Sequence, residues 1–398
     1  MPAAQAHEAG IARSLTARLP DFPWDVLAPS AAVAARHPGG IVDLSIGTPV
    51  DPVPELVRQA LAGAADAPGY PQTKGTPALR AAASGWLARR HGVHVSPDAV
   101  LPVIGTKELI AWLPTLLGCG PGDMVAFPEL AYPTYDVGAR LAGARSLPTD
   151  LPDLTDRPDL PGRPDLPRGI GAVRLAWVNS PSNPTGRVLP ASRLRELVSW
   201  ARTSGAVVAS DECYIDLGFD TTPVSVLHPD VCGQSHDGVL GVYSLSKRSN
   251  LAGYRAGFVT GDAELVAELL EVRKHAGMIV PAPVQAAMTA ALADDGHAAE
   301  QHARYARRRQ ALRPALEAAG WVVSHSEAGL YLWASYPGRD CWESVGALAE
   351  IGILVSPGAF YGAAGSEHIR VALTATDERI AAAAARLAEL AASEQSLG

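Results

Sequence analysis

The chain has 398 residues, which is enough for two domains and a large buried core. Its formal charge is −8 and no long basic run occurs, which argues against nucleic-acid binding or an acidic membrane surface as partner. No apolar stretch reaches the roughly 18 to 20 residues of a membrane span. Residues 1–10 lack the apolar core of a secretion signal. The four cysteines are scattered without metal or redox spacing, so we expect no metal site and a cytoplasmic protein with reduced thiols.

In chain order, the first clear elements are a strand over residues 100–104 and a helix over residues 106–117, separated by Gly105. A helix N-terminus offers unpaired N–H groups and a positive dipole end, so Gly105, Thr106 and Lys107 could seat a phosphate. Taken alone, Thr106 is better explained as a simple helix N-cap.

A second apolar strand, residues 124–127, leads towards Tyr132. Residues 147–169 then form a stretch rich in Pro and Asp, in which Arg-Pro-Asp-Leu-Pro occurs twice. Because proline fixes φ and removes a backbone donor, this stretch is expected as an exposed, partly polyproline loop inserted between two strands of the sheet. A tolerated insertion is favoured over a peptide-docking segment.

Three further strands end in polar residues of complementary chemistry. A strand over residues 173–178 precedes Asn183, a strand from residue 207 ends at Asp211 and Tyr214, and a third apolar run ends at Lys247. The carboxyl ends of strands in an open parallel sheet form its ligand crevice. Lys247 is one of only four lysines, and a desolvated lysine is a nucleophile that can form a Schiff base. In isolation, its motif is more typical of a surface loop.

Together these strand ends supply what a pyridoxal 5′-phosphate (PLP) enzyme needs. Lys247 is expected as the Schiff-base lysine and Asp211 as the acid for the pyridine nitrogen. Asn183 and Tyr214 are expected to hydrogen-bond the phenolic oxygen of the cofactor. The phosphate, an anion that suits a guanidinium, is assigned to side chains near the lysine, namely Ser244, Ser246 and Arg255.

The last third of the chain changes character. Residues 255–260 return as a strand, and residues 285–316 are expected as one helix that crosses between domains. Beyond it we expect paired strands over 322–336, a helix over 341–350, a strand over 368–375 and a helix over 377–390. This pattern predicts a second, smaller α+β domain.

The motifs Asn-Pro-Thr-Gly (183–186), Ser-Asp-Glu-Cys-Tyr (210–214), Ser-Leu-Ser-Lys (244–247) and Gly-Tyr-Arg-Ala-Gly (253–257) resemble the class I/II aminotransferases of PLP fold type I. The resemblance runs from about residue 44 to residue 370. It implies an α/β large domain with a mostly parallel central sheet flanked by helices over residues 50–280. A small α+β domain would combine residues 1–49 with an interdomain helix and residues up to the C-terminus, 281–398.

The resemblance also implies roles for individual residues. Gly105, Thr106 and Lys107 match backbone contacts to the phosphate, and Tyr132 matches the ring that lies against the pyridine. Tyr70 matches a tyrosine that reaches the phosphate of a neighbouring subunit, which implies a homodimer with shared active sites.

The substrate carboxylate is assigned to a second group of residues. Arg370 lies among apolar strand residues, where a buried charge needs an anionic partner, either an internal carboxylate or a ligand. It matches the family's arginine that grips the substrate α-carboxylate, where Asn183 also contributes. Gly47 matches the N-terminal segment that closes over the same carboxylate.

The implied reaction is amino transfer by a ping-pong mechanism, with Lys247, Asp211 and Tyr214 as catalytic residues. Asp211 keeps the ring nitrogen protonated, and Lys247 moves a proton at the substrate Cα as general base and then acid. Long segments (128–142, 246–261, 327–333 and 355–376) are most similar to the N-succinyldiaminopimelate aminotransferases. This implies N-succinyl-LL-2,6-diaminopimelate and 2-oxoglutarate as substrates, in the diaminopimelate route to lysine. Lys107 and Arg248 are candidates for binding the distal carboxylates.

Three alternatives stay open. A broader aminotransferase could act on aspartate, aromatic amino acids or unsuccinylated LL-diaminopimelate. A PLP-dependent C–S lyase would use the same lysine, acid and arginine. An aminotransferase-like DNA-binding regulator is disfavoured, because the segment before residue 44 has no helix-turn-helix pattern and little positive charge.

Overall fold

A seven-stranded sheet forms the centre of the larger part of the molecule. The computed structural model of the protein describes residues 15–20, 23–150 and 172–395. The strand order is β2-β8-β7-β6-β5-β3-β4. Their bounds are β2 (Val100–Ile104), β3 (Met124–Phe127), β4 (Arg145–Pro148), β5 (Val173–Asn179), β6 (Val207–Asp211), β7 (Val239–Ser244) and β8 (Ala256–Gly261). All neighbouring strands are parallel except β8, which is antiparallel to both β7 and β2. The predicted α/β fold with a mostly parallel sheet is confirmed.

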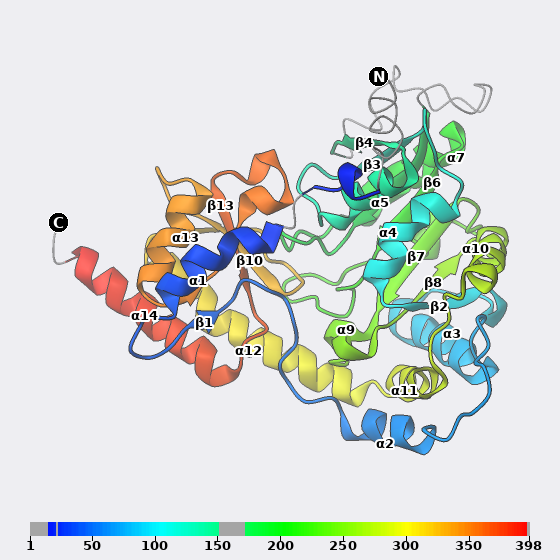
Figure 1. The fold of residues 1–398 in the computed structure, drawn as a ribbon, viewed down its shortest axis with the longest axis horizontal. Coiled ribbons are helices and arrows are strands. Elements are labelled where there is room, and N and C mark those ends of the chain that lie inside the picture. Colours follow the sequence, from blue (N-terminus) through cyan, green and yellow to red (C-terminus); the bar gives the residue numbers. More distant parts are fainter. Residues whose placement is uncertain (1–14, 21–22, 151–171, 396–398) are drawn as a thin grey trace, which may run out of the picture.

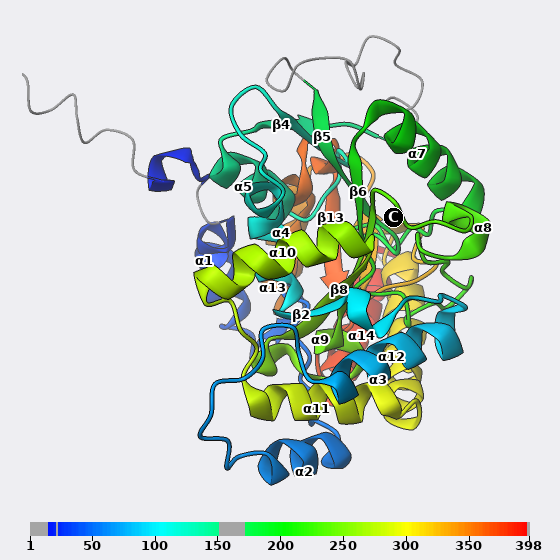
Figure 2. The ribbon, with the colours of Figure 1, turned by 90° about the vertical axis from the view of Figure 1, so that its right-hand side faces the viewer.

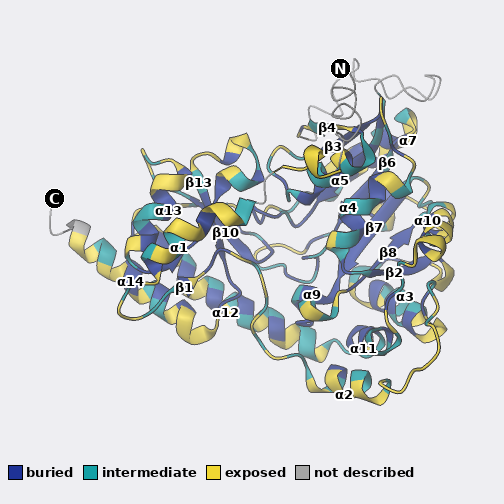
Figure 3. Cartoon of the chain, in the orientation of Figure 1, coloured by how far each residue is buried: buried dark blue, intermediate teal, exposed yellow. Residues whose placement is uncertain are grey.

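Helices cover both faces of this sheet (Figures 1 and 2). Successive strand residues point to opposite faces, so Val208 and Ala209 enter different apolar clusters. One cluster packs against α3 (Pro77–His91), α7 (Ala191–Ser204) and α11 (Ala282–Ala293). The other packs against α4 (Thr106–Leu116), α5 (Thr134–Ala142) and α10 (Ala263–Ala276). Figure 3 shows the result, with buried central strands between helices whose outer faces are exposed.

A second, smaller part has its own sheets and its own apolar cluster. Its strands are β1 (Val42–Asp43), β9 (Val322–Ser324), β10 (Tyr331–Ser335), β11 (Ile353–Leu354), β12 (Ser356–Pro357) and β13 (His368–Ala372). Four of them form the sheet β12-β13-β10-β9, and β1 pairs in parallel with β11. The helices α1 (Ala28–Ala34), α13 (Cys341–Glu350) and α14 (Asp377–Gln395) belong to this part. As expected, the N-terminal segment joins the C-terminal third, while the domain boundaries themselves stay a prediction.

The expected single helix over residues 285–316 is wrong. The structure has α11 and then a separate helix, α12 (Gly296–Ala318), which runs between the two parts of the molecule (Figure 1). The break follows from Asp294, whose carboxylate accepts hydrogen bonds from the backbone N–H of His297 at 2.9 Å and from its Nδ1 at 2.6 Å. An acidic side chain just before a helix that accepts one of the first backbone N–H groups favours a helix start at that point.

Three smaller elements complete the larger part, namely α2 (Glu55–Gly63), α8 (Pro229–Cys232) and α9 (Leu245–Arg248). The Pro/Asp-rich stretch was expected to be a loop from residue 147, but residues 147 and 148 end strand β4 instead. Pro148 can stand there because β4 is the edge strand of the sheet. Residues 151–169 of that stretch lie outside the described residues. Within the described ranges, no helix combines the length and apolarity that crossing a membrane requires.

A buried ion pair joins the N-terminal segment to α12. The guanidinium of Arg308 donates to both carboxylate oxygens of Asp51, at 2.6 and 2.8 Å, and to Asp377 at the start of α14. Gln301 donates to the same Asp51 carboxylate at 2.8 Å. Burial opposes the ionisation of Asp51, but these hydrogen bonds and the charges of Arg308 and Arg304 outweigh it, so its pKa is lowered. The N-terminal segment that contains Asp51 is therefore fixed to α12 by an ion pair.

We expect Asp51→Asn to lower the free energy of unfolding by about 3 kcal/mol, because it leaves the Arg308 guanidinium buried with a weaker partner. This destabilisation reaches its full size above pH 3.8, the ordinary pKa of an aspartate carboxyl. It shrinks as the pH falls through the lower pKa that Asp51 has in the folded protein. Urea unfolding at pH 7 and at lower pH measures both effects. Asp220→Asn is the control, since Asp220 pairs with Arg309 at the surface and should contribute less than about 1 kcal/mol. Equal losses for the two variants would contradict this account.

Candidate active site

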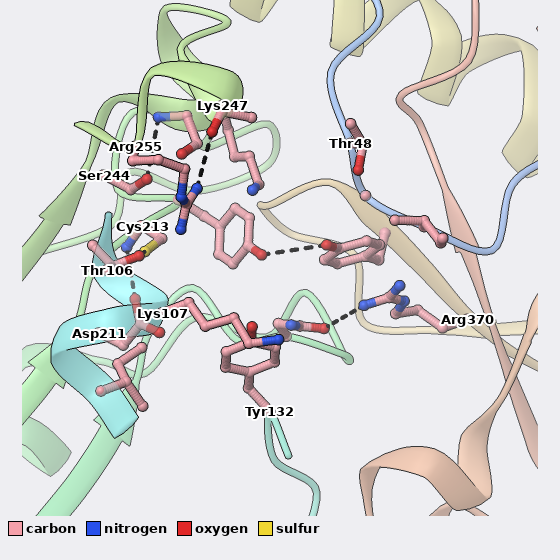
Figure 4. Close-up of a pocket in the computed structure, with 18 of the residues that line it drawn as sticks. Thr48, Thr106, Lys107, Tyr132, Asp211, Cys213, Ser244, Lys247, Arg255 and Arg370 are labelled. Atoms are coloured by element: carbon pink, nitrogen blue, oxygen red, sulfur yellow. Dashed lines mark hydrogen bonds between the residues drawn. The ribbon is translucent and has the colours of Figure 1, made fainter. Parts of the chain in front are cut away.

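A cavity of about 550 Å³ lies where the carboxyl ends of β6 and β7 face strands β10 and β13 (Figure 4). Most of the residues that the sequence analysis selected line it together, namely Gly47, Thr106, Lys107, Tyr132, Asn183, Asp211, Tyr214, Ser244, Ser246, Lys247, Arg255 and Arg370. Gly105 lies directly behind them, as the N-cap residue of α4. Tyr70 is fully exposed in the single chain and does not line the cavity.

Lys247 reaches the cavity from a helix and not from the end of a strand. Strand β7 stops at Ser244, whose hydroxyl accepts the N–H of Ser246 at 3.1 Å and so starts the short helix α9. Lys247 follows on α9, and its carbonyl accepts a hydrogen bond from the Tyr305 hydroxyl of α12 at 3.3 Å. In Figure 4 the Lys247 side chain projects into the cavity. The backbone that carries the Lys247 amine is thus fixed by hydrogen bonds from two elements.

Asp211 ends β6 and is buried at the floor of the cavity. Its carboxylate accepts hydrogen bonds from the Tyr135 hydroxyl at 2.9 Å and from the Cys213 N–H at 3.2 Å. Burial raises its pKa, and these hydrogen bonds offset only part of that effect. Within the described part of the chain, no arginine or lysine forms an ion pair with it. A positively charged ligand group would therefore stabilise its ionised form.

Gly105, Thr106 and Arg255 form a cradle at the N-terminus of α4. Gly105 has φ +76°, and a Cβ there would lie 2.5 Å from Nη2 of Arg255, so a glycine is required for the guanidinium to pack against this turn. Arg255 precedes β8 in a left-handed conformation, with φ +56°, and donates to the Ala252 carbonyl at 2.9 Å. The interpretation of Thr106 as the helix N-cap is wrong, because Gly105 is the N-cap residue of α4 and the Thr106 hydroxyl instead lies 3.3 Å from the Cys213 thiol. Unpaired N–H groups and a guanidinium suit a phosphate.

Arg370 carries a buried positive charge on the opposite wall. Its Nη1 donates to the Asn183 side-chain oxygen at 2.9 Å and its Nη2 donates to the Ser45 carbonyl at 2.7 Å. Its Nε is buried without a hydrogen-bond partner. Among the described residues it forms no ion pair with a carboxylate, so the alternative of an internal carboxylate partner finds no support. The guanidinium is available to an anionic ligand.

The N-terminal segment closes the cavity from above. The Ser45 carbonyl also accepts the Ser356 hydroxyl at 2.7 Å, and the Ile46 carbonyl accepts the Thr374 hydroxyl at 3.0 Å. Gly47 follows, and a side chain at this position would overlap the Tyr331 hydroxyl. The backbone of the N-terminal segment can therefore approach the Tyr331 hydroxyl this closely only because position 47 is a glycine.

Arg248 is not where the sequence analysis put it. It was a candidate for binding distal carboxylates, but its side chain is buried and does not line the cavity. Its Nε donates to Asp216 at 2.6 Å, and its guanidinium lies 5.2 Å from the centre of the Trp86 ring. A neighbouring carboxylate five residues after Asp211 satisfies this arginine, and no local sequence signal distinguishes it from a ligand-binding one.

Sequence reasoning also missed several side chains of the site. Trp24, Thr48, Cys213 and Tyr331 line the cavity, and Tyr135 supports Asp211 from below. Cys213 stands within the motif of residues 210–214 and Thr48 directly follows Gly47, whereas the other three come from segments whose pattern indicates only packing or a loop. Tyr135 lies in the first turn of α5 and Tyr132 stands just before that helix, and their spacing of three residues is the signal that could have placed both rings on the same side.

Residues 40–387 match the family described as aminotransferase class I and II. The chain belongs to the class I and II aminotransferases. Its relatives include a 4-dedimethylamino-4-oxo-anhydrotetracycline transaminase, OxyQ, of Streptomyces rimosus, at 62% identity over 93% of this chain and 99% of that protein. An LL-diaminopimelate aminotransferase of Dehalococcoides mccartyi is 34% identical over 90% of this chain and 94% of that protein. Among solved structures, the N-succinyldiaminopimelate aminotransferase of Mycobacterium tuberculosis has a TM-score of 0.79 at 28% identity, covering 92% and 97% of the two chains.

Members of this family depend on PLP, and the residues of this aminotransferase fit that cofactor. A lysine amine faces the cavity, a buried carboxylate lacks a strong positive partner, and a helix N-terminus with an arginine forms an anion cradle. These three groups match the aldehyde, the pyridine nitrogen and the phosphate of PLP. The three groups come from α9, β6 and the start of α4, so the match to PLP does not depend on a single motif.

We expect Gly105→Ala to weaken PLP binding by at least about tenfold, because the added methyl displaces the Arg255 guanidinium and strains a backbone with positive φ. Titration of the cofactor-free aminotransferase with PLP, followed by absorbance, measures the dissociation constant. Gly120→Ala is the matched control, since a Cβ at Gly120 meets nothing within 4 Å. Unchanged affinity in Gly105→Ala would show that this cradle does not hold the phosphate.

Proposed function

We propose that this aminotransferase transfers an amino group between N-succinyl-LL-2,6-diaminopimelate and 2-oxoglutarate, in the diaminopimelate route to lysine. The observation that carries the proposal is Arg370, a buried guanidinium with no carboxylate partner in the described residues and with Lys247 lining the same cavity. Such an arginine favours a substrate with a carboxylate beside the reacting carbon.

The second carboxylate of the substrate is assigned to Lys107. It stands in the first turn of α4 and lines the same cavity, on the wall across from Arg370 (Figure 4). Partial loss of hydration and the charge of Arg255 lower its pKa, so an anionic group beside it would stabilise the ammonium. Two cationic side chains on facing walls favour a substrate that carries carboxylates at both ends. The relatives named for diaminopimelate and its succinyl derivative support the same substrate class.

PLP, when bound, supplies an electron sink for the bonds at the substrate Cα. The Lys247 amine would hold the cofactor and then move a proton at that Cα as general base and general acid. Asp211 would stabilise positive charge at the floor of the site, and Tyr214 would donate a hydrogen bond from the wall beside it. Arg370 with Asn183 would orient the α-carboxylate, and the segment at Gly47 would exclude water.

We also infer a cytoplasmic homodimer in which Tyr70 of each subunit reaches the phosphate site of the other. Tyr70 is 100% exposed in the single chain, as is expected of a large side chain that is covered by a second subunit. Gly105, Thr106, Ser244, Ser246 and Arg255 would complete that phosphate site within one subunit. Tyr132 would lie against the pyridine ring.

The relationship to OxyQ favours a second candidate, amino transfer to a ketone on a fused-ring compound such as a 4-oxo-anhydrotetracycline. A ring ketone of this kind has no adjacent carboxylate, so Arg370 would have an anionic ligand only in the other half-reaction, in which an amino-acid donor brings its α-carboxylate. Unsuccinylated LL-diaminopimelate, aspartate and aromatic amino acids remain the broader alternatives. Substrate assays separate these candidates.

Lys247→Ala should abolish turnover while the protein still binds PLP without a covalent bond. Lys107 also lines the cavity, but the proposal assigns it to the second carboxylate of the substrate and not to the cofactor aldehyde. Borohydride reduction followed by peptide mass spectrometry should find PLP on Lys247 in the wild type and on no lysine in the variant. Lys74→Ala, a surface lysine paired with Asp98, is the control. A reduced adduct on Lys74, Lys107 or Lys274 of the wild type would overturn the assignment.

The substrate is tested by the visible spectrum of the PLP-loaded enzyme, titrated separately with N-succinyl-LL-2,6-diaminopimelate, LL-diaminopimelate and glutamate. We expect the succinylated compound and glutamate to discharge the cofactor band, and 2-oxoglutarate to restore it. A response to glutamate but not to the succinylated compound would remove the pathway assignment and keep the aminotransferase. Amination of a fused-ring ketone would favour the second candidate, and ammonia release without an acceptor would indicate elimination.

The assignment of Lys107 has its own variant. Lys107→Met should raise the KM for the succinylated substrate by about tenfold and change the KM for alanine little, because only the former has a distal carboxylate. Lys274→Met is the matched control, since Lys274 pairs with Glu271 at the surface. An equal effect on both substrates would assign Lys107 to the cofactor phosphate instead.

A further inference from the structure

Tyr331 occupies a position between the two walls of the active site. It is the first residue of strand β10, is buried and lines the cavity. On β13, the antiparallel neighbour of β10, the residue opposite Tyr331 is Ala372, two positions after Arg370 on the same face. The small alanine leaves room for the tyrosine ring to lean along the strand towards the guanidinium.

The Tyr331 ring covers one face of the Arg370 guanidinium. The guanidinium carbon lies 3.9 Å from the centre of the Tyr331 ring and 4.7 Å from the centre of the Tyr361 ring. An aromatic face attracts a cation, and this attraction grows when both are removed from water, as they are here. Unlike a carboxylate, a neutral phenol stabilises the charge without competing for the hydrogen bonds that an anionic ligand needs.

The hydroxyl of Tyr331 is fixed from the other side. It lies 3.3 Å from the Tyr214 hydroxyl, and the two rings meet edge to face with 5.9 Å between their centres. It also faces the backbone at Gly47, where any side chain would overlap it. The ring that covers Arg370 is therefore held in place at its far end by a residue of the β6 wall.

We propose that Tyr331 is a positioning residue for carboxylate recognition. Its ring keeps the guanidinium plane of Arg370 oriented for the substrate, and Tyr214 anchors that ring through the contact between the two hydroxyls. In consequence, the substrate carboxylate meets an arginine whose orientation is set before binding, which reduces the ordering that binding requires. This inference rests on the proposed role of Arg370 and adds a residue for which neither the motifs nor the relatives assign a role.

The test uses the PLP-loaded enzyme and glutarate, a dicarboxylate that has no amino group and cannot react. Calorimetric titration should show that Tyr331→Leu weakens glutarate binding by about tenfold, because the cation loses the aromatic face. Tyr331→Phe keeps that face and loses the anchor, so it should weaken binding by only about twofold to threefold. For amino-acid substrates, Tyr331→Leu should raise KM more than it lowers kcat.

Two comparisons separate this inference from a general structural role and from the proposed function. Tyr336→Leu removes another tyrosine ring, 3.9 Å from the guanidinium carbon of Arg339 at the end of the same strand, and should leave glutarate affinity unchanged. In an Arg370→Ala background, Tyr331→Leu should have no further effect on glutarate, since the tyrosine acts through the arginine.

The outcomes are distinct. If Arg370→Ala binds glutarate like the wild type, the carboxylate site is elsewhere and the proposed function loses its main support, together with this inference. If Arg370→Ala loses glutarate but Tyr331→Leu retains wild-type affinity, the positioning role alone is wrong. A further loss on adding Tyr331→Leu to Arg370→Ala would likewise contradict action through the arginine.

Discussion

The site depends above all on one buried positive charge that no carboxylate among the described residues neutralises. Arg370 comes from the small sheet, but its hydrogen bonds reach Asn183 of the large part and Ser45 of the N-terminal segment. Burying a guanidinium is costly, and neutral acceptors and aromatic faces offset only part of that cost. The strand of Arg370, the loop of Asn183 and the N-terminal segment of Ser45 therefore meet around a positive charge that an anionic ligand would neutralise. The cavity and the proposed recognition of carboxylates have the same physical origin.

Most of the architecture could be predicted because its signals are local. The helix over residues 341–350 agrees with α13 at both ends. The strand that precedes Asn183 and the strand that ends at Asp211 follow from short, mostly apolar runs of the kind that a sheet buried on both faces requires. The motif residues lie together because parallel strands end at one edge. The break between α11 and α12 was missed, since it depends on the side chain of Asp294 taking two hydrogen bonds from His297.

The residues of the active site likewise include some that the sequence predicts and some that it does not. Lys247, Asp211 and Arg255 stand in recognisable motifs, so their positions could be expected. Arg248 was misassigned because the sequence does not reveal which charged side chains pair with each other. In the structure Arg248 forms an ion pair with Asp216. Tyr331 was missed for a related reason. The Tyr214 hydroxyl that anchors its ring lies 117 residues away in the chain, and alternation within a strand indicates only that Tyr331 is buried.

The pairing of β1 with β11 has a consequence for how the protein is made. The Ser45 carbonyl is bonded to Ser356, 311 residues later in the chain, so the N-terminal edge of the site has no partner until nearly the whole chain has left the ribosome. Contacts this distant in sequence are slow to form, and the parts that fold earlier are those with near neighbours. The large sheet can therefore assemble during synthesis as a scaffold, while the wall that carries Arg370 closes last. A nascent chain would acquire its cofactor surface before it could discriminate between substrates.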